Sequence, residues 1–257
     1  MDDWAGRLYR ELDEWNFAGV AASMWWRDDD AQAPSAALDR ALELAQKYHA
    51  PLALAVIPHR MDAALAARLA AAKSTVCVLQ HGFAHRNHAR PDEKKMELGA
   101  HRPAAAVHHE LGAGFAALRS AFGARFTPAL TPPWNRIAPE LLAELADAGF
   151  TGLSTFGPRP APAAAPGLRV VNTHADIIDW KNGKRFAGAD AAAGALVAHL
   201  RARRLGEVDD AEPTGLLTHH LVHDDAAWEF LARLLAQLDD HPAVKWRRAE
   251  EIFAARN

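Results

Sequence analysis

The sequence lacks the features that mark several large classes of protein. Its single cysteine, Cys77, excludes an intrachain disulfide framework. The formal net charge is only -3, with both signs mixed along the chain, so no electrostatic case exists for binding nucleic acid. The longest apolar run beside a predicted strand, PLALAVIP at 51–58, is far too short to span a bilayer. The start, MDDWAGRLYRELDEW, has neither the basic residues nor the apolar core of a secretory signal, and we expect a cytoplasmic protein.

Predicted strands and helices alternate along the 257 residues, half of which are hydrophobic. This alternation predicts an α/β fold with a parallel sheet of seven to eight strands, closed or nearly closed into one barrel domain over 1–257. Residues 1–17 are expected to form an N-terminal helix packed on the barrel, and the Pro/Ala-rich stretch 157–167 an external loop. The strands are expected at 20–26, 52–57, 75–80, 127–130, 151–155, 168–172, 215–219 and 243–246, and further helices at 34–49, 62–72, 104–122, 138–148, 190–204, 225–238 and 248–255.

Polar residues follow five of the predicted strands, and four of these segments are rich in histidine or aspartate. In parallel barrels the loops at the carboxyl ends of the strands hold the chemistry, so these residues should meet on one rim. The five segments are RDDD at 27–30, HGFAHRNH at 81–88, TPPWNR at 131–136, THADIIDW at 173–180 and HHLVHD at 219–224.

The residue types on this rim suit a hydrolytic metal centre. His81 and His85 are four positions apart, so on one helical turn both imidazoles would face the same side and bind one ion. A carboxylate from another strand end would complete three protein ligands and leave room for water. A second carboxylate could act as general base, and a histidine on the opposite side could protonate the leaving group.

Taken in order, these motifs resemble polysaccharide deacetylases of the NodB-homology, carbohydrate esterase 4-like family. The matching segments are the Asp pair after the first strand, HGFAH, TPPW, DIIDW and LTHH, which together span about residues 20 to 224. The resemblance implies a distorted (β/α) barrel. It also implies divalent-metal-dependent removal of N- or O-acyl groups from sugars.

The resemblance assigns roles by position. It implies Asp29 as the base and Asp30, His81 and His85 as ligands of a divalent ion, which is expected to be zinc, with cobalt, nickel and manganese also suited to mixed N/O ligands. Three consecutive aspartates leave a second register open, in which Asp28 is the base and Asp29 the ligand.

The general acid and the substrate pocket follow from the later motifs. Leu217-Thr218-His219 matches the family's Leu-x-His, which makes His219 the expected acid, with His220 and His223 as competing candidates. Four residues of the third and fourth motifs are expected to bind substrate: Trp134, Asn135, Asp179 and Trp180.

Two positions depart from the family pattern. Gly82 stands where the family has a hydroxyl residue, and Thr131 stands where it has the arginine that pairs with the base. Arg27 lies two residues before Asp29, so alternation along a strand would put both side chains on one face and let Arg27 replace the missing arginine. Arg136 is the other candidate.

Three functions remain open on these residues. The first is a deacetylase acting on an N-acetylated sugar or glycoconjugate, with a small-molecule or oligosaccharide substrate. The second is a hydrolase of amide bonds in a non-sugar substrate. The third is a barrel that has lost catalysis and only binds carbohydrate, which the threonine at 131 favours. The sequence leaves the oligomeric state open, a homo-oligomer included.

Overall fold

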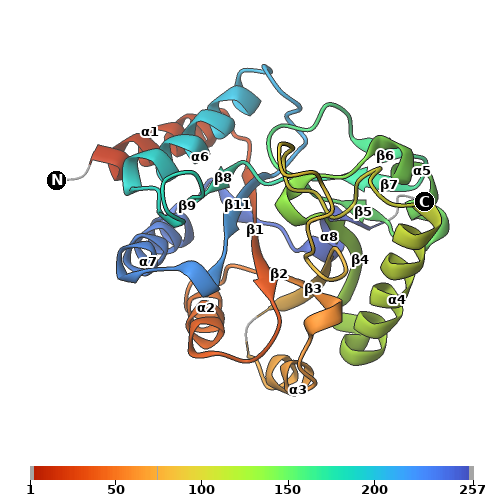
Figure 1. Cartoon of the computed structure of the whole chain (residues 1–257). Coiled ribbons are helices and arrows are strands. Elements are labelled where there is room, and N and C mark those ends of the chain that lie inside the picture. Colours follow the sequence, from red (N-terminus) through yellow and green to blue (C-terminus); the bar gives the residue numbers. More distant parts are fainter. Residues whose placement is uncertain (1–2, 74, 255–257) are drawn as a thin grey trace.

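Strands and helices alternate in the structure, a computed structural model that describes residues 3–73 and 75–254 (Figure 1). The expected helical positions 1–2 and 255 lie outside the described residues. The helices are α1 Asp3–Phe17, α2 Ala36–Lys47, α3 Ala64–Ala70, α4 Ala104–Phe122, α5 Leu142–Asp147, α6 Ala189–Arg204, α7 Asp225–Asp240 and α8 Ala249–Ile252. The strands are β1 Ala22–Ala31, β2 Leu52–Val56, β3 Val76–His81, β4 Phe126–Thr131, β5 Gly152–Leu153, β6 Ala163–Ala165, β7 Leu168–Val170, β8 Ala175–Asp176, β9 Ile178–Asp179, β10 Arg185–Phe186, β11 Thr214–Thr218 and β12 Val244–Trp246.

The main sheet confirms the predicted α/β barrel. Its strands follow the order β6-β7-β5-β4-β3-β2-β1-β11-β8, with β12 beside β1. The pairs are parallel except for β6 with β7. Parallel neighbours joined by helices place all their carboxyl ends on one rim, which is where the polar motifs lie.

One short segment joins the two edges of the sheet. Val171 N donates to Leu153 O beside β5, whereas His174 N donates to Gly215 O beside β11. The backbone therefore changes partner within three residues. The barrel is distorted at this seam, between β7 and β8, because a bent segment replaces a continuous strand there.

Side chains alternate between the barrel interior and the helix layer, as the two-residue period of a strand requires. In β1, Met24 and Trp26 pack in the outer core beneath the helices, whereas Trp25 lies in the inner cluster. Phe253, directly after α8, meets the Trp25 ring edge-on at 5.8 Å and closes one end of the interior. The inner cluster consists of Trp25, Ala53, Ala55, Cys77, Leu79, Ala129, Val171, Ala249, Ile252 and Phe253.

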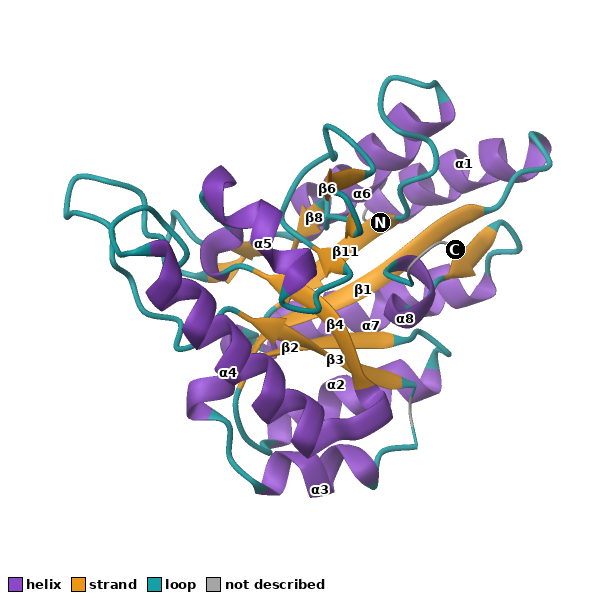
Figure 2. Cartoon of the chain, turned by 90° about the vertical axis from the view of Figure 1, so that its right-hand side faces the viewer, coloured by secondary structure: helices purple, strands orange, loops and turns teal. Residues whose placement is uncertain are grey.

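Helices cover the outside of the barrel (Figure 2). α1 lies along α6, where Glu11 pairs with Arg204 at 2.8 Å and Arg7 pairs with Asp190 at 2.6 Å. Within the described part of the chain, no helix combines the length and the apolar character needed to cross a membrane.

Two predicted boundaries were wrong in ways that matter for the site. The first strand does not end at Trp26 but continues through all three aspartates to Ala31. It can do so because it stays paired on at least one side: β11 follows it to Asp28, which pairs with Thr218, and β2 follows it to Ala31, which pairs with Val56. The external loop expected at 157–167 contains β6, which pairs antiparallel with β7.

Candidate active site

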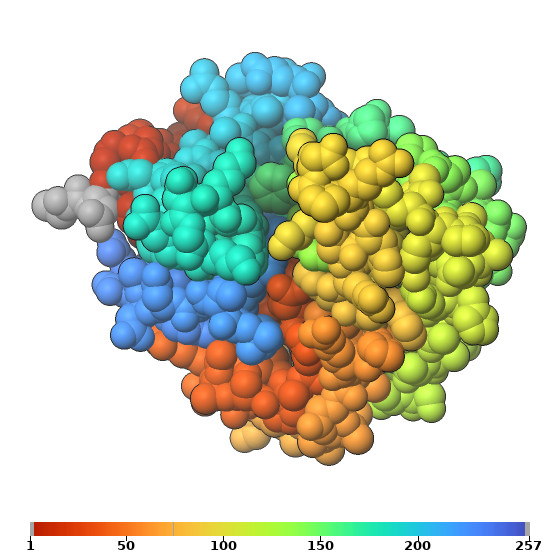
Figure 3. Space-filling model, viewed as in Figure 1, coloured from red at the N-terminus to blue at the C-terminus, as the bar shows by residue number. Residues whose placement is uncertain are grey.

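The rim at the carboxyl ends of the strands is hollowed. Figure 3 shows a recess between the yellow segment that follows β3 and the teal segment around β8 to β10. Segments that are far apart in the sequence thus form the two walls of one cleft.

The end of β1 distributes its charged side chains over two faces. Arg27 and Asp29 continue the inward face of Trp25, and Asp28 points the other way. Asp30 has φ +73, in the left-handed region, and the β1–β2 register shifts between Asp28 and Ala31. This bulge turns Asp30 out of the alternating pattern, so that consecutive aspartates serve different partners.

Asp30, His81 and His85 lie together. Asp30 Oδ1 is 3.1 Å from His81 Nε2 and 3.3 Å from His85 Nε2. That oxygen is buried and has no hydrogen-bond partner among the described residues. Ligand atoms on a tetrahedral zinc, with bonds of 2.0–2.1 Å, lie roughly 3.3 Å apart. The spacing, the orphaned oxygen and the His/carboxylate donor set therefore fit a divalent ion.

The spacing of the two histidines predicted that they meet on one helical turn, but they do not. His81 ends β3, and the chain then turns through Gly82 (φ +55) and His85 (φ +54). The Trp134 ring packs against His85 with 4.5 Å between ring centroids, and Trp134 itself has φ +56. Several left-handed non-glycine residues at one site indicate a backbone that its surroundings hold in place.

The proton on His81 is assigned by its hydrogen bonds. His81 Nδ1 lies 2.8 Å from the carbonyl oxygen of Thr131, which can only accept, so Nδ1 carries hydrogen. Nε2 then presents its lone pair toward Asp30. Thr131 Oγ1 supports the same nitrogen at 3.2 Å and donates to the carbonyl of Gln80 at 3.0 Å.

Charges in the cluster shift each other's titration. Burial acts to raise the pKa of Asp30, but the neighbouring imidazoles of His81 and then His85 hold it below its ordinary value. Burial acts to lower the pKa of His81, yet Asp29 and Asp30 raise it overall. The pKa of His85 is lowered by burial and then by His81.

The Arg27 side chain contacts the Asp29 carboxylate through two of its nitrogen atoms. Nε lies 2.9 Å from Oδ1, and Nη2 donates to Oδ2 at 2.9 Å. The guanidinium is fully buried and also donates to Ser154 Oγ at 2.7 Å and Asn135 Oδ1 at 2.7 Å. Arg27 thus occupies the pairing position for which Arg136 was the alternative, and Arg136 instead donates to Lys95 O at 2.9 Å.

His219 lies across the site from the group formed by Asp30, His81 and His85. Its Nε2 is 4.0 Å from Asp29 Oδ2, and its Nδ1 is 3.7 Å from Asp176 Oδ1. Trp180 meets the His219 ring edge-on at 4.6 Å and donates from Nε1 to Asp176 Oδ2 at 2.7 Å. Burial raises the pKa of Asp176.

Asp28 and His220 belong to the layer behind the site. Asp28 accepts hydrogen bonds from Thr218 Oγ1 at 2.6 Å and from His220 N at 3.0 Å, and it contacts His220 Nδ1. Its carboxylate thereby ties down both residues that flank His219. His223 Nε2 accepts from His219 N at 3.3 Å, and burial lowers the pKa of His223 to about 4.

Three polar residues of the third and fourth motifs have contacts that the sequence patterns did not predict. The carboxylate of Asp179, expected to bind substrate, accepts from Lys181 N and Asn182 N and so closes its own turn. Asp176 lies beside His219 instead. It belongs to the same motif as Asp179, and the sequence did not show which of the two aspartates faces the site. Asn135 supports Arg27.

A second group of the same composition lies at the barrel seam. Ligand-capable atoms of His174, His199 and Glu212 fall within 4.8 Å of one another. His174 Nδ1, however, accepts from Gly215 N at 2.9 Å, so its proton sits on Nε2, which faces Glu212 Oε2 at 3.3 Å. Both Glu212 oxygens already accept backbone N–H groups, those of Asn172 at 2.8 Å and Arg159 at 2.9 Å. The carboxylate of this group is therefore already held by backbone hydrogen bonds.

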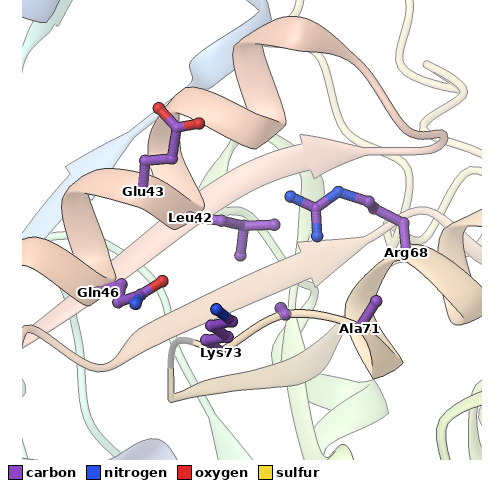
Figure 4. Close-up of a pocket in the computed structure, with 7 residues that line it drawn as sticks. Leu42, Glu43, Gln46, Arg68, Ala71 and Lys73 are labelled. Atoms are coloured by element: carbon purple, nitrogen blue, oxygen red, sulfur yellow. The ribbon is translucent and has the colours of Figure 1, made fainter.

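A hollow of about 260 Å³ between α2 and α3 lies elsewhere (Figure 4). It is lined by Leu42, Glu43, Gln46, Arg68, Ala71, Ala72 and Lys73, near the carboxyl ends of the two helices. These helices lead back to the starts of β2 and β3. The hollow is therefore on the face of the barrel opposite to the strand-end rim, where packing and stability are the rule.

No protein-family model matches the sequence, and no curated protein matches it either. Solved structures do match the fold over most of the chain. A family 4 acetyl xylan esterase from Clostridium thermocellum in complex with a cobalt ion is 16% identical, covers 90% of each chain and gives a TM-score of 0.54. The chain shares its fold with family 4 carbohydrate esterases and with a putative polysaccharide deacetylase from Mycobacterium smegmatis.

Two further structures show that this fold occurs both in an esterase and in a pseudoenzyme. A family 4 carbohydrate esterase from Streptomyces lividans in complex with acetate is 16% identical, with a TM-score of 0.56, over 87% of this chain and 90% of that one. A family 4 pseudoenzyme from Bacillus anthracis, BA3943, is 15% identical, with a TM-score of 0.57, over 91% of this chain and 66% of that one. Fold likeness therefore does not decide between catalysis and its loss, and the site residues must.

Proposed function

We propose that this chain is a metal-dependent hydrolase that removes an acetyl group from an N-acetylated sugar or glycoconjugate. Asp30, His81 and His85 would hold a divalent ion, zinc being the best fit to two imidazoles and one carboxylate. When bound, such an ion polarises an acyl carbonyl and lowers the pKa of water.

The observation that best supports catalysis is the Arg27–Asp29 pair. A base aspartate must be correctly aimed, and the buried Arg27 side chain holds the Asp29 carboxylate through one ion-pair contact and one hydrogen bond. Asp29 takes the proton from the attacking water as it adds to the acyl carbon. His219, 4.0 Å away, delivers a proton to the leaving nitrogen as the carbon–nitrogen bond breaks. Acetate and a free amine are the products.

The aromatic side chains next to the two histidines suit a sugar ring. Trp134 packs on His85, and Trp180, which is 40% exposed, packs on His219. Apolar ring faces on both sides of the reacting groups favour a flat, partly apolar substrate over a charged peptide.

The second candidate is a barrel that binds carbohydrate without turnover. The pseudoenzyme with the same fold and the threonine at 131 favour it. Arg27 removes the main argument for it, because the contact expected from an arginine at 131 is made from β1.

Acetate release distinguishes the candidates. Metal-loaded protein should release acetate from N-acetylated chito-oligosaccharides, and chelator-stripped protein should not. Tight sugar binding with metal present but no acetate would favour the binding module. Turnover of a non-sugar amide alone would identify a different amidohydrolase.

A further inference from the structure

The loop between His81 and His85 is shaped by a residue outside every motif. Glu97 is 1% exposed, yet it lies in a polar stretch and faces no cationic partner at hydrogen-bond distance among the described residues. Its carboxylate accepts three backbone N–H groups of that loop, from Phe83 at 3.1 Å, Ala84 at 2.8 Å and Arg86 at 3.2 Å. A buried carboxylate held by three amides is a fixed structural centre.

Gly82 is matched to this arrangement. A Cβ built at Gly82 would lie 2.1 Å from Glu97 Oε2 and 2.6 Å from Pro133 Cδ, and the residue has φ +55. The Glu97 carboxylate therefore fills the space that a side chain at 82 would need. A side chain at position 82 would collide with the Glu97 carboxylate in its present place.

The rest of the loop is tied from the other side. Gln80 Nε2 donates to Gly82 O at 3.0 Å, and Gly82 N donates to Thr131 O at 3.2 Å. Glu97 itself is anchored by its neighbour Leu98, which is fully buried in the second core cluster and accepts from Ala138 N at 2.8 Å. Glu97 thus links the core to the backbone on both sides of His85.

We propose that Glu97 is a positioning residue for the metal site, which fixes the left-handed turn that brings His85 to His81 and Asp30. The inference rests on the metal site of the proposed function. It does not require that the substrate be a sugar. A preorganised loop lets both histidines bind an ion without first ordering the backbone, whereas a loose loop would have that entropic cost on binding.

The test compares Glu97→Gln with Glu93→Gln, an exposed glutamate of the same segment. Co²⁺ affinity is measured by competition with a chelator, and amide exchange is followed in the metal-free protein. E97Q should weaken Co²⁺ binding roughly 10–100-fold and speed exchange at Phe83, Ala84 and Arg86. E93Q should match the wild type in both measurements.

Two results would overturn the proposal. One is wild-type Co²⁺ affinity in folded E97Q. The other is fast exchange of the backbone amides of residues 83, 84 and 86 in the metal-free wild type. This measurement needs no variant, so it remains available if E97Q does not fold. If Co²⁺ binds tightly and its affinity depends on Glu97, but no acetate is released, only the proposed function is contradicted.

Discussion

Two clusters in this molecule have the same composition, two histidines and one carboxylate, but opposite hydrogen-bond settings. His81 Nδ1 faces a carbonyl oxygen, so its Nε2 lone pair is free to face Asp30. His174 Nδ1 faces a backbone N–H, so its Nε2 holds the proton and points it at Glu212. Residue type and proximity are therefore not enough to make a metal site. The outer contacts decide which nitrogen is available.

The carboxylates differ in the same way. Asp30 Oδ1 is buried with no hydrogen-bond partner among the described residues, whereas both oxygens of Glu212 accept backbone N–H groups. The first cluster thus offers a carboxylate oxygen with room for an ion, whereas the carboxylate of the second is already held by the backbone.

Removing the carboxylate of the first cluster should have the largest effect. Asp30→Ala removes the only carboxylate of the three ligands, so it should abolish binding of one equivalent of Co²⁺ and acetate release together. Glu212→Gln is the matched control and should retain the full equivalent. Metal content after dialysis measures both variants. Metal lost from E212Q but kept in D30A would reverse the two assignments.

Separating binding from chemistry gives the next largest effect. Asp29→Asn keeps the shape of the base but not its charge, so acetate release should fall roughly 10²–10⁴-fold. Co²⁺ content should remain that of the wild type, because Asp30 holds the ion. Turnover retained in D29N would point to another base.

A smaller effect tests the contacts behind the histidines. Thr131→Val removes the hydroxyl 3.2 Å from His81 Nδ1 but leaves the carbonyl contact, so Co²⁺ affinity should fall about tenfold, the low end for such contacts. Thr214→Val makes the same change beside His199, whose Nδ1 lies 3.0 Å from Thr214 Oγ1. It should leave Co²⁺ affinity unchanged, and equal losses in the two variants would contradict the comparison.

The smallest effect is on the pH dependence of stability. Burial lowers the pKa of His174, and burial with the charge of His174 lowers the pKa of His199 to about 2. Below the unfolded value near 6.5 the unfolded chain binds protons that the folded chain does not, so stability falls as the pH is lowered through this range. Each histidine contributes up to about 1.4 kcal/mol per pH unit in that window.

Urea unfolding between about pH 6.5 and pH 5 measures this slope. His199→Gln should flatten it, and His49→Gln, whose side chain is 81% exposed, should not. An unchanged slope in H199Q would show that this histidine is not buried in its neutral form.

Sequence periodicity predicted the parts of the site that depend on local geometry. The parallel barrel follows from alternating strands and helices, and the place of Arg27 beside Asp29 follows from side-chain alternation in one strand. The proximity of His81 and His85 was expected, but for the wrong reason, since a left-handed loop and not a helical turn joins them.

Other features depend on residues far apart in the chain. Asp28 is held by Thr218 and His220, about 190 positions away, so three equivalent aspartates in the sequence have three different environments. Glu97 lies between Met96 and Leu98 in a polar stretch, and that apolar flanking is the one local sign that it is buried. The tautomer of each histidine depends on backbone groups that no pattern of side chains reveals.

Anomalous scattering from a crystal soaked with Co²⁺ would locate a bound ion. We expect one strong peak bounded by Asp30 Oδ1, His81 Nε2 and His85 Nε2, and none at His174, His199 and Glu212. A peak at the seam cluster, or no peak at the first cluster at saturating Co²⁺, would contradict this expectation.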